Sequence, residues 1–375
     1  MTEVKAMSKP AAKNHEPLFH VVKRPANPLW QSLLIRAGSI LAALIVAGLL
    51  TYFLTGLNPI SVYSTMIDGA IGTEKRIWNL LQGIALLLCV SLAVTPAFKM
   101  KFWNIGAEGQ ALMGGLASAL CMILLSDKLS PAMLMTVMVI TSIVLGAVWA
   151  LIPAIFKAKW NTNETLFTLM MNYIAMQIVS YFAYKYSVPK GSGSIGIINS
   201  ISKAGWFPSV FGQKYFLNIL IVVILTVLLY VYLKHSKHGY EISVVGESEN
   251  TAKYIGINVK KVIIRTMILS GALCGIAGLL MVAGTDHTIA TETVGGRGFT
   301  AIMVSWLAKF NPIMMFLTSF LLVFFEKGAI AISSEFDLNN SFSDIITGII
   351  IFFIIGSEFF INYSIKFREK EGKNK

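Results

Sequence analysis

The chain has 375 residues, of which 55% are hydrophobic and 13% are charged, and its formal net charge at pH 7 is +12. A mean hydropathy of +0.69 lies outside the range of soluble domains and inside that of polytopic membrane proteins. The excess of basic residues therefore does not indicate nucleic-acid binding, because in a membrane protein basic residues are concentrated in the loops that lie inside the cell. Cys89, Cys121 and Cys274 lie within apolar runs and form no CxxC or Cys/His cluster, so neither a disulfide nor a metal site is predicted.

Residues 1–30 are basic and broken by prolines, and they are predicted to be a flexible cytosolic tail rather than a signal peptide. A membrane domain is predicted over residues 31–365, followed by a lysine-rich cytosolic tail at 366–375. Most of the 31 lysines and arginines fall in the two tails and in three further places, around Lys99, around Lys157 and over Lys234–Arg265. The positive-inside rule then places both termini in the cytosol and the chain in the cell membrane.

The membrane domain consists of apolar runs separated by polar turns, and a helix of about 20 apolar residues crosses a bilayer. One run, Phe299–Ala308, has only about ten residues, roughly 15 Å of helix, and is expected to be a half-span or a short tilted span. The predicted fold is an all-α polytopic membrane protein with about ten transmembrane helices, some interrupted, in two pseudo-related halves. The stretch Gly56–Lys75 is predicted to be a polar connection. The ten runs are Leu33–Leu54, Ile77–Ala97, Phe102–Leu125, Ala132–Phe156, Glu164–Tyr184, Phe216–Leu233, Val262–Ala283, Phe299–Ala308, Ile313–Phe325 and Phe342–Phe360.

The basic stretch Lys234–Arg265 is much longer than a connection between two spans needs to be. Ser248 is expected to cap the helical turns that follow it, and Gly256 is expected to end them. Two interpretations stay open, a solvated surface loop and a docking element for a cytosolic partner. The apolar residues of the stretch recur at the spacings of an amphipathic helix, namely Ile242, Val245, Ala252, Ile255 and Val259.

Two glycine-interrupted segments, Asn104–Gly115 and Gly295–Pro312, lie at roughly corresponding places in the two halves. Paired interruptions point to a transport pathway near the midplane of the membrane, although close helix packing produces the same pattern. Small residues at Ala107–Ala119 and Gly271–Gly278 recur at the spacing that lets helices approach closely. The interrupted segments also supply neutral polar groups and aromatic rings suited to a neutral ring with hydroxyls, namely Asn104, Gln110, Ser305, Trp103, Phe299 and Trp306. Glu108 is a further candidate for the substrate pathway.

The chain contains no GxxxxGK[ST] sequence, so it is predicted to hold no ATP on a P-loop of its own. It also has no HExxH and no Ser/His/Asp arrangement among the spans. Asp286 and His287 are interpreted as a hydrogen-bonded surface pair at a span end. We therefore predict a protein that is not an enzyme and carries no cofactor or metal.

Four motifs, in this order, resemble one family closely. They are WNIGAEGQALMGG at Trp103–Gly115, TNETLFTLMMNYIA at Thr162–Ala175, VGESENTAKYIGIN at Val245–Asn258 and GGRGFTAIMVSWLAKFNP at Gly295–Pro312. The chain looks like a permease subunit of ABC importers of the branched-chain amino acid/ribose superfamily, in its nucleoside and simple-sugar branch. The resemblance covers roughly residues 33–362, and Asn172 in the second motif joins the pathway candidates.

The resemblance implies an importer driven by ATPase subunits on separate chains, with the loop over 234–261 as the coupling element. It also implies a second permease subunit, expected to be a homologous chain in a heterodimer, and an extracytoplasmic substrate-binding lipoprotein, in contact with membrane lipid and no nucleic acid. The family's usual Asn-Pro after the coupling glutamate reads Ser248-Glu249-Asn250 here, which leaves the shape of that turn open. The coupling residues implied are Val245, Gly246, Glu247, Ala252, Tyr254, Gly256 and Ile257.

The predicted function is import of a small neutral solute by alternating access, with nucleosides favoured over simple sugars. Branched-chain amino acids are disfavoured, because only Glu292 with Arg297 approaches the acid–base pair that a zwitterion favours. An ion-coupled secondary transporter is the alternative, with Glu108, Glu326 and Asp344 as its candidate ionisable groups. A pore or receptor scaffold ranks behind both.

Overall fold

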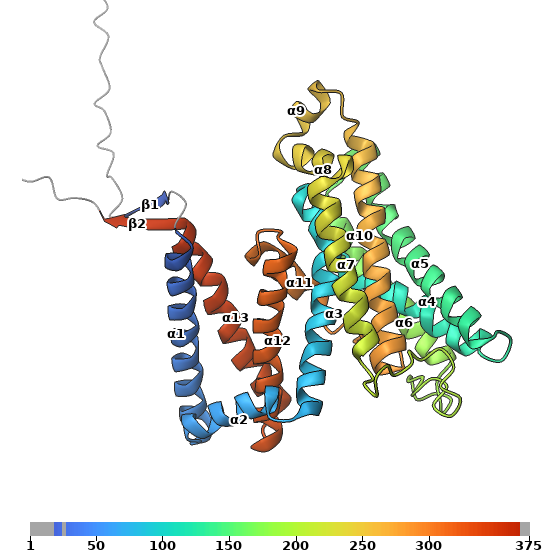
Figure 1. Cartoon of the computed structure of the whole chain (residues 1–375), viewed down its shortest axis with the longest axis horizontal. Helices are drawn as coiled ribbons and strands as arrows, with labels where there is room; N and C mark the ends of the chain where they lie inside the picture. The colour runs from blue at the N-terminus through green and yellow to red at the C-terminus, as the bar shows by residue number, and fades with distance from the viewer. Residues whose placement is uncertain (1–18, 25–27, 368–375) are drawn as a thin grey trace, which may run out of the picture. The chain divides into compact units, whose positions relative to one another are not determined.

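A computed structural model describes residues 19–24 and 28–367 of the chain (Figure 1). Most of the predicted N-terminal tail, and residues 368–375 of the predicted C-terminal tail, lie outside the described residues. The elements, in chain order, are β1 (Phe19–Lys23), α1 (Leu29–Thr55), α2 (Pro59–Ile71), α3 (Glu74–Lys99), α4 (Ala107–Leu125), α5 (Pro131–Trp160), α6 (Glu164–Lys185), α7 (Phe216–His235), α8 (Lys237–Glu247), α9 (Glu249–Tyr254), α10 (Val259–Met281), the π-helical turn η1 (Val282–Asp286), α11 (Arg297–Leu307), α12 (Pro312–Glu335), α13 (Asn340–Asn362) and β2 (Tyr363–Phe367).

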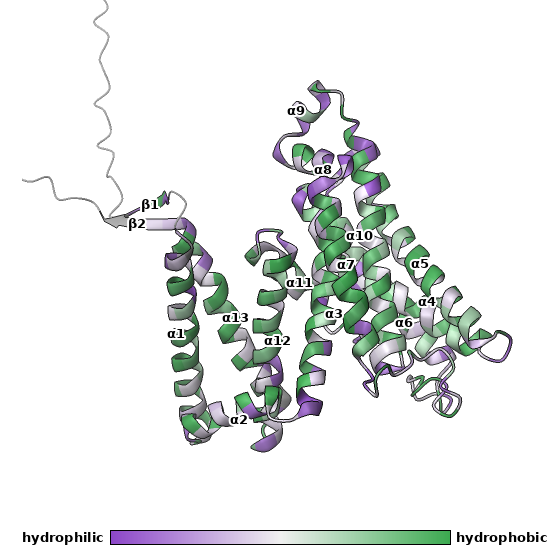
Figure 2. Cartoon of the chain, in the orientation of Figure 1, coloured by the Kyte–Doolittle hydropathy of each residue, from purple (hydrophilic) through white to green (hydrophobic). Residues whose placement is uncertain are grey.

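Nine helices within the described ranges are long and apolar enough to cross a membrane, which confirms the all-α polytopic class. Figure 2 shows hydrophobic residues along these helices and hydrophilic residues at their ends and on α8 and α9. The eighth predicted run, Phe299–Ala308, forms α11, whose 11 residues make it too short to span. That the two halves are related stays a prediction.

The chain divides into two compact units, residues 1–59 with 344–375 and residues 60–343, which are described separately. In the first unit, β1 and β2 pair antiparallel, with Phe19 opposite Phe367 and Lys23 opposite Tyr363. Part of each predicted tail is therefore a strand, and the segment before the first span lies beside the segment after the last. Arg36 of α1 forms an ion pair with Glu358 of α13.

The second unit is built around α3, α4, α5 and α10, which are packed closely because glycines face one another. A Cβ on Gly275 would overlap the backbone of Ser142 in α5, and one on Gly278 would overlap the carbonyl of Ala111 in α4. The prediction of close packing between these helices is confirmed. Van der Waals contact between backbones replaces the hydrophobic driving force that is weak between helices in lipid.

Three predicted boundaries were wrong. Gly56–Lys75 is not a polar connection but contains α2, whose Val62, Met66 and Ala70 are buried. The run predicted from Phe102 becomes helical only at Ala107, after a non-helical segment over 102–106. The run predicted to end at Phe325 continues to Glu335, because Glu326 and Lys327 do not interrupt a helix whose other faces pack against protein.

The second unit has two ends that bear different elements (Figure 1). One end carries α8 and α9, and we call it the α8–α9 end. The other, which we call the distal end, carries α2, the start of α3 and the long 186–215 connection. Backbone hydrogen bonds from Ile198 to His287 (2.8 Å) and from Phe207 to Ala283 (3.0 Å) hold that connection against the end of α10.

Candidate functional site

The α8–α9 segment consists of two short helices. Capping side chains mark where α8, α9 and the following helix α10 begin. The Ser236, Ser248 and Asn258 side chains accept hydrogen bonds from the backbone N–H groups of Gly239, Thr251 and Lys261 at 2.9, 3.2 and 3.1 Å. Such caps satisfy N–H groups that have no partner within the helix. The predicted cap at Ser248 is confirmed, and Gly256 adopts the left-handed conformation (φ +85°) directly after the last turn.

The predicted coupling residues fall on opposite faces of this segment. Those that face the transmembrane core include Gly246, whose Cβ would overlap the carbonyl oxygen of Lys99 at the end of α3. Those that face away include Tyr254, which is 93% exposed. The buried members are Val245, Gly246 and Ala252, the exposed members are Glu247, Tyr254 and Gly256, and Ile257 is intermediate.

His238 anchors α8 to the spans beneath it. Its Nδ1 is hydrogen-bonded to the Tyr232 hydroxyl of α7, and its Nε2 lies 3.5 Å from the Thr266 hydroxyl of α10. Burial lowers the pKa of His238, opposed by the nearby Glu241 carboxylate. Through its two ring nitrogens, His238 connects α8 to both α7 and α10.

The pathway candidates around the start of α4 form an inner polar network, made of Asn104, Glu108, Gln110 and Asn172 with Ser270. The amide of Asn104 exchanges two hydrogen bonds with that of Gln110 (3.0 and 3.2 Å) and donates a third to Ser270 of α10 (3.1 Å). Asn172 of α6 accepts from the N–H of Gly109 and donates to the carbonyl of Ile105, both at 2.9 Å. These bonds hold the non-helical segment that precedes α4.

Glu108 joins the start of α4 to the start of α11. Its two carboxylate oxygens accept hydrogen bonds from the N–H groups of Gly296 (2.8 Å) and Gly298 (2.7 Å), and its side chain is 2% exposed. A carboxylate at a helix N-terminus is stabilised by the unpaired N–H groups and by the helix dipole. Gly298 permits this approach, since a Cβ there would lie 2.8 Å from a Glu108 oxygen.

The remaining candidates lie on α11 and face in two directions. Ser305 is buried, and its hydroxyl lies 2.9 Å from the carbonyl oxygens of Ser91 and Ala301, to either of which it can donate. Phe299 and Trp306 are 43% and 50% exposed, and the Trp306 ring lies 5.6 Å from that of Trp103. Among the predicted pathway residues, the polar ones are thus satisfied by protein groups and only the aromatic ones present a free surface.

The distal end carries three cavities, of about 470, 550 and 700 Å³, and the first two are lined in part by the start of α3. Sequence reasoning did not find them. The first lies between α2, α3 and α12 and shares Asn79 with the second, and the second shares Lys214 and Tyr215 with the third. Because they share walls, we treat them as one group and call them the distal cavities.

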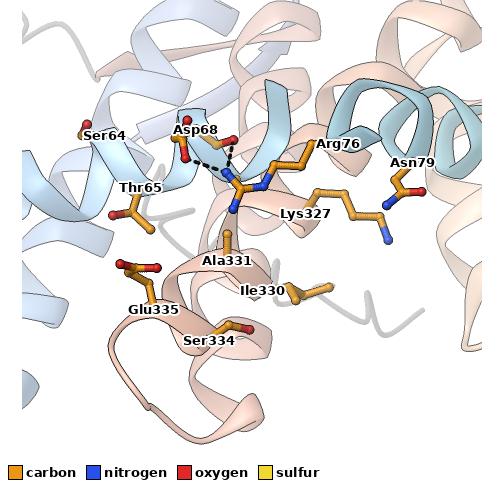
Figure 3. A pocket seen from close by; sticks show the side chains of 11 residues that line it. Ser64, Thr65, Asp68, Arg76, Asn79, Lys327, Ile330, Ala331, Ser334 and Glu335 are labelled. Carbon is orange, nitrogen blue, oxygen red and sulfur yellow. Dashed lines mark hydrogen bonds and ion pairs between the residues drawn. The ribbon is translucent and has the colours of Figure 1, made fainter. Parts of the chain in front are cut away.

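The first cavity has a charged lining (Figure 3). Arg76 forms an ion pair with Asp68 at 2.5 Å and also donates to the Asp68 carbonyl at 3.0 Å. Lys327 extends from α12 on the side of the pocket where Asn79 lies, and Glu335 lies on the opposite side. The charged residues Glu326-Lys327 within an apolar run were the available signal for a polar surface on α12.

The third and largest cavity is lined by the η1 turn and by the aromatic residues of the 186–215 connection. The prediction of a hydrogen-bonded Asp286–His287 pair was wrong. The His287 ring instead stacks on Trp206, with centroids 3.6 Å apart and planes within 2°. Burial, reinforced by the charge of Lys214, lowers the pKa of His287. Asp286 projects into the cavity as an exposed side chain.

Behind the third cavity, the Thr285 hydroxyl accepts hydrogen bonds from Gln82 of α3 (2.5 Å) and Asn218 of α7 (3.5 Å). The side-chain oxygens of Gln82 and Asn218 are buried, and neither has a partner among the described residues. A buried acceptor without a partner costs about 1–3 kcal/mol, so native proteins carry few of them. Their concentration at a π-helical turn matches the tendency of such turns to occur at functional sites.

Comparison with known proteins identifies relatives over most of this chain. The sequence profile of the family described as "Branched-chain amino acid transport system / permease component" matches residues 76–355. A glucose ABC transporter permease of Haloferax volcanii is 27% identical over 90% of this chain and 91% of the relative. A guanosine ABC transporter permease of Bacillus subtilis is 28% identical over 88% of this chain and 95% of the relative. A nucleoside ABC transporter permease of Lactococcus lactis is 28% identical over 80% and 84%. No solved structure matches the chain.

Proposed function

The chain belongs to the family of permease components of branched-chain amino acid transport systems, and we propose that it is the membrane-spanning subunit of an ABC importer that brings nucleosides into the cell. The observation that carries this proposal is the similarity to a guanosine permease over 88% of this chain and to a nucleoside permease over 80% of it. The cavity sizes agree with it, since small-molecule sites typically occupy about 300–1,000 Å³.

Import of simple sugars is the second candidate, because the glucose permease of Haloferax volcanii is comparably similar. Both solutes are neutral polyols, and only the nucleoside adds a flat ring that can stack. The aromatic lining of the third distal cavity, which includes Trp206, Phe207 and Tyr215, favours the nucleoside.

The test is uptake by cells that lack their own nucleoside and sugar importers and express this chain with its ATPase and binding protein. Labelled guanosine should accumulate, and excess uridine or adenosine should compete where glucose, ribose and galactose do not. If labelled sugar is taken up and excess guanosine does not reduce that uptake, the transported solute is a sugar and not a nucleoside. Uptake that persists after ATP depletion would favour an ion-coupled transporter.

We further propose that the exposed face of α8–α9 docks on separate ATPase subunits and that this chain holds no ATP site of its own. Tyr254 is the sharpest probe, since at 93% exposure its side chain contributes nothing measurable to the fold. A bulky residue at Gly246 is a poor probe, because it would displace α8 from α3. Tyr254→Ala should reduce ATPase co-purification and guanosine uptake at least tenfold without changing thermal stability. Lys128→Ala, which changes an exposed lysine in the turn between α4 and α5, should alter neither co-purification nor uptake. Normal co-purification of Tyr254→Ala would contradict docking through this face.

The same proposal places the α8–α9 end in the cytosol, together with both termini, and the distal end outside the cell. The concentration of basic residues at Lys234–Arg265 and in the tails supports this orientation. An extracytoplasmic binding lipoprotein would then deliver solute to the distal end, and a second, homologous permease would complete the pathway. In a background without Cys89, Cys121 and Cys274, an impermeant thiol reagent should label Ser194→Cys in intact cells and Lys253→Cys only after permeabilisation. The reverse labelling pattern would show that the α8–α9 end lies outside the cell and would contradict the proposed orientation.

A further inference from the structure

Asp286 lies where two of the distal cavities approach each other. It lines the third cavity, while Lys327 lines the first. Thr285, the residue before Asp286, is hydrogen-bonded to Gln82 of α3, and a Cβ on the adjacent Gly83 would lie 3.6 Å from Cε of Lys327. The turn that carries Asp286 is therefore bonded to α3 one residue from the position that Lys327 approaches.

The charge of Asp286 is balanced without direct pairing. Arg297 and Lys327 lie close enough to act on it electrostatically. Within residues 19–24 and 28–367, however, no ion pair within 4.0 Å and no hydrogen bond occupies its carboxylate oxygens. This contrasts with Asp68 in the first cavity, whose carboxylate is occupied by Arg76. Asp286 thus offers two free acceptor oxygens to the contents of the third cavity.

The surroundings of Asp286 restrict what those oxygens can accept from. Two neighbouring hydroxyls present two donors at the spacing of a carboxylate, and an acidic residue serves this purpose for ribose in dinucleotide-binding folds. The same cavity carries the Trp206–His287 stack and Tyr215, which provide flat apolar surface. The Trp206 indole N–H is already bonded to the carbonyl of Ile198 (2.9 Å), so its ring remains for stacking. A solute with a vicinal diol at one end and a flat ring at the other matches both features.

We propose that the third distal cavity is a solute-binding subsite in which Asp286 accepts hydrogen bonds from the 2′- and 3′-hydroxyls of a ribonucleoside, so that the permease itself favours ribonucleosides over 2′-deoxyribonucleosides. This inference rests on the proposed nucleoside import and adds the chemical group that is recognised. Thr285, on the same turn, also lines the cavity and supplies a hydroxyl at the sugar end of the subsite, and Gln82 and Asn218 hold that hydroxyl from behind. Asp286 acts here as a specificity-determining residue.

The experiment compares Asp286→Asn with wild type in the importer assembled with the same ATPase and binding protein. The readout is uptake of labelled guanosine and of labelled 2′-deoxyguanosine at concentrations below half-saturation. A hydrogen bond to a charged acceptor supports about a tenfold discrimination. Asp286→Asn should therefore lower guanosine uptake about tenfold more than 2′-deoxyguanosine uptake, because the deoxynucleoside loses only the hydrogen bond from its 3′-hydroxyl. Asp286→Glu, which retains the carboxylate, should recover part of the preference.

The matched control is Asp127→Asn, which removes an exposed carboxylate from a turn at the same end without touching the cavity. Its ratio of guanosine to 2′-deoxyguanosine uptake should equal that of wild type. An equal fall for both nucleosides in Asp286→Asn would assign Asp286 to binding-protein contact or folding and overturn the subsite, as would unchanged uptake of both. Wild-type uptake of sugar and not of nucleoside is a separate result, since it would overturn the proposed function before the Asp286 variants are compared.

Discussion

The inner polar network and the distal cavities are both polar regions of an apolar protein, yet their polar groups are satisfied in different ways. In the network, Glu108 and Asn104 are 2% and 0% exposed, and each meets protein donors or acceptors. In the cavities, Lys327 and Asp286 lie beside open space with no hydrogen bond or ion pair to the described residues. Polar groups satisfied within the protein stabilise a conformation, whereas those facing a cavity are available to a ligand. The network therefore holds the interrupted helices in place, and the cavities are the better place to seek solute contacts.

The largest expected effect is the loss of stability in Glu108→Ala. This change leaves the N–H groups of Gly296 and Gly298 buried without an acceptor, at about 1–3 kcal/mol each. We expect a destabilisation of about 2–5 kcal/mol, measured as a lower thermal unfolding midpoint of the purified protein in detergent. Glu335→Ala, which removes an exposed carboxylate from the first cavity, should stay within about 0.5 kcal/mol of wild type. Equal destabilisation by the two variants would contradict the conclusion that the network stabilises the fold and the cavity groups do not.

An intermediate effect is expected for Gln82→Met, which keeps the length of the side chain. The change removes the hydrogen bond to Thr285 but also removes a buried oxygen that has no partner among the described residues. The two contributions oppose each other, so stability should change by less than about 1 kcal/mol. Guanosine uptake should nevertheless fall severalfold, because Thr285 in the wall of the third cavity loses the hydrogen bond that positions its hydroxyl. A large fall in the unfolding midpoint would instead show that Gln82 belongs with the structural groups.

The smallest expected effect is on the pH dependence of stability at His287. Its pKa in the folded protein lies below the ordinary value of about 6.5, because of burial and of Lys214. The unfolded chain therefore binds a proton first, so the contribution of His287 is fully present above about pH 6.5 and is lost as the pH falls toward the folded pKa. His287→Asn should flatten the decline of the unfolding midpoint between about pH 7 and pH 5. An identical decline in variant and wild type would contradict the lowered pKa.

The sequence alone determined the class of the protein and the local signals along it. Apolar runs of bilayer length, the Ser248 cap and the glycines at 271–278 depend on nearby residues or on the solvent, and each was predicted correctly. Motifs spread over four segments were also sufficient to indicate the permease family. Where a helix is amphipathic and flanked by polar residues, as α2 is, local composition resembled a connection and the prediction failed.

Only the tertiary structure decided which polar residues are occupied and which are free. Glu108 and Asp286 are both acids at the end of an apolar run, and nothing nearby in the sequence distinguishes them. Glu108 meets two N–H groups that follow it by 188 and 190 positions, whereas Asp286 faces a cavity lined by the 206–215 connection. Whether such an acid stabilises the fold or is free to recognise a solute depends on partners brought together by helix packing. Those partners are remote in sequence, so they cannot be predicted from the periodicity or composition of the residues around each acid.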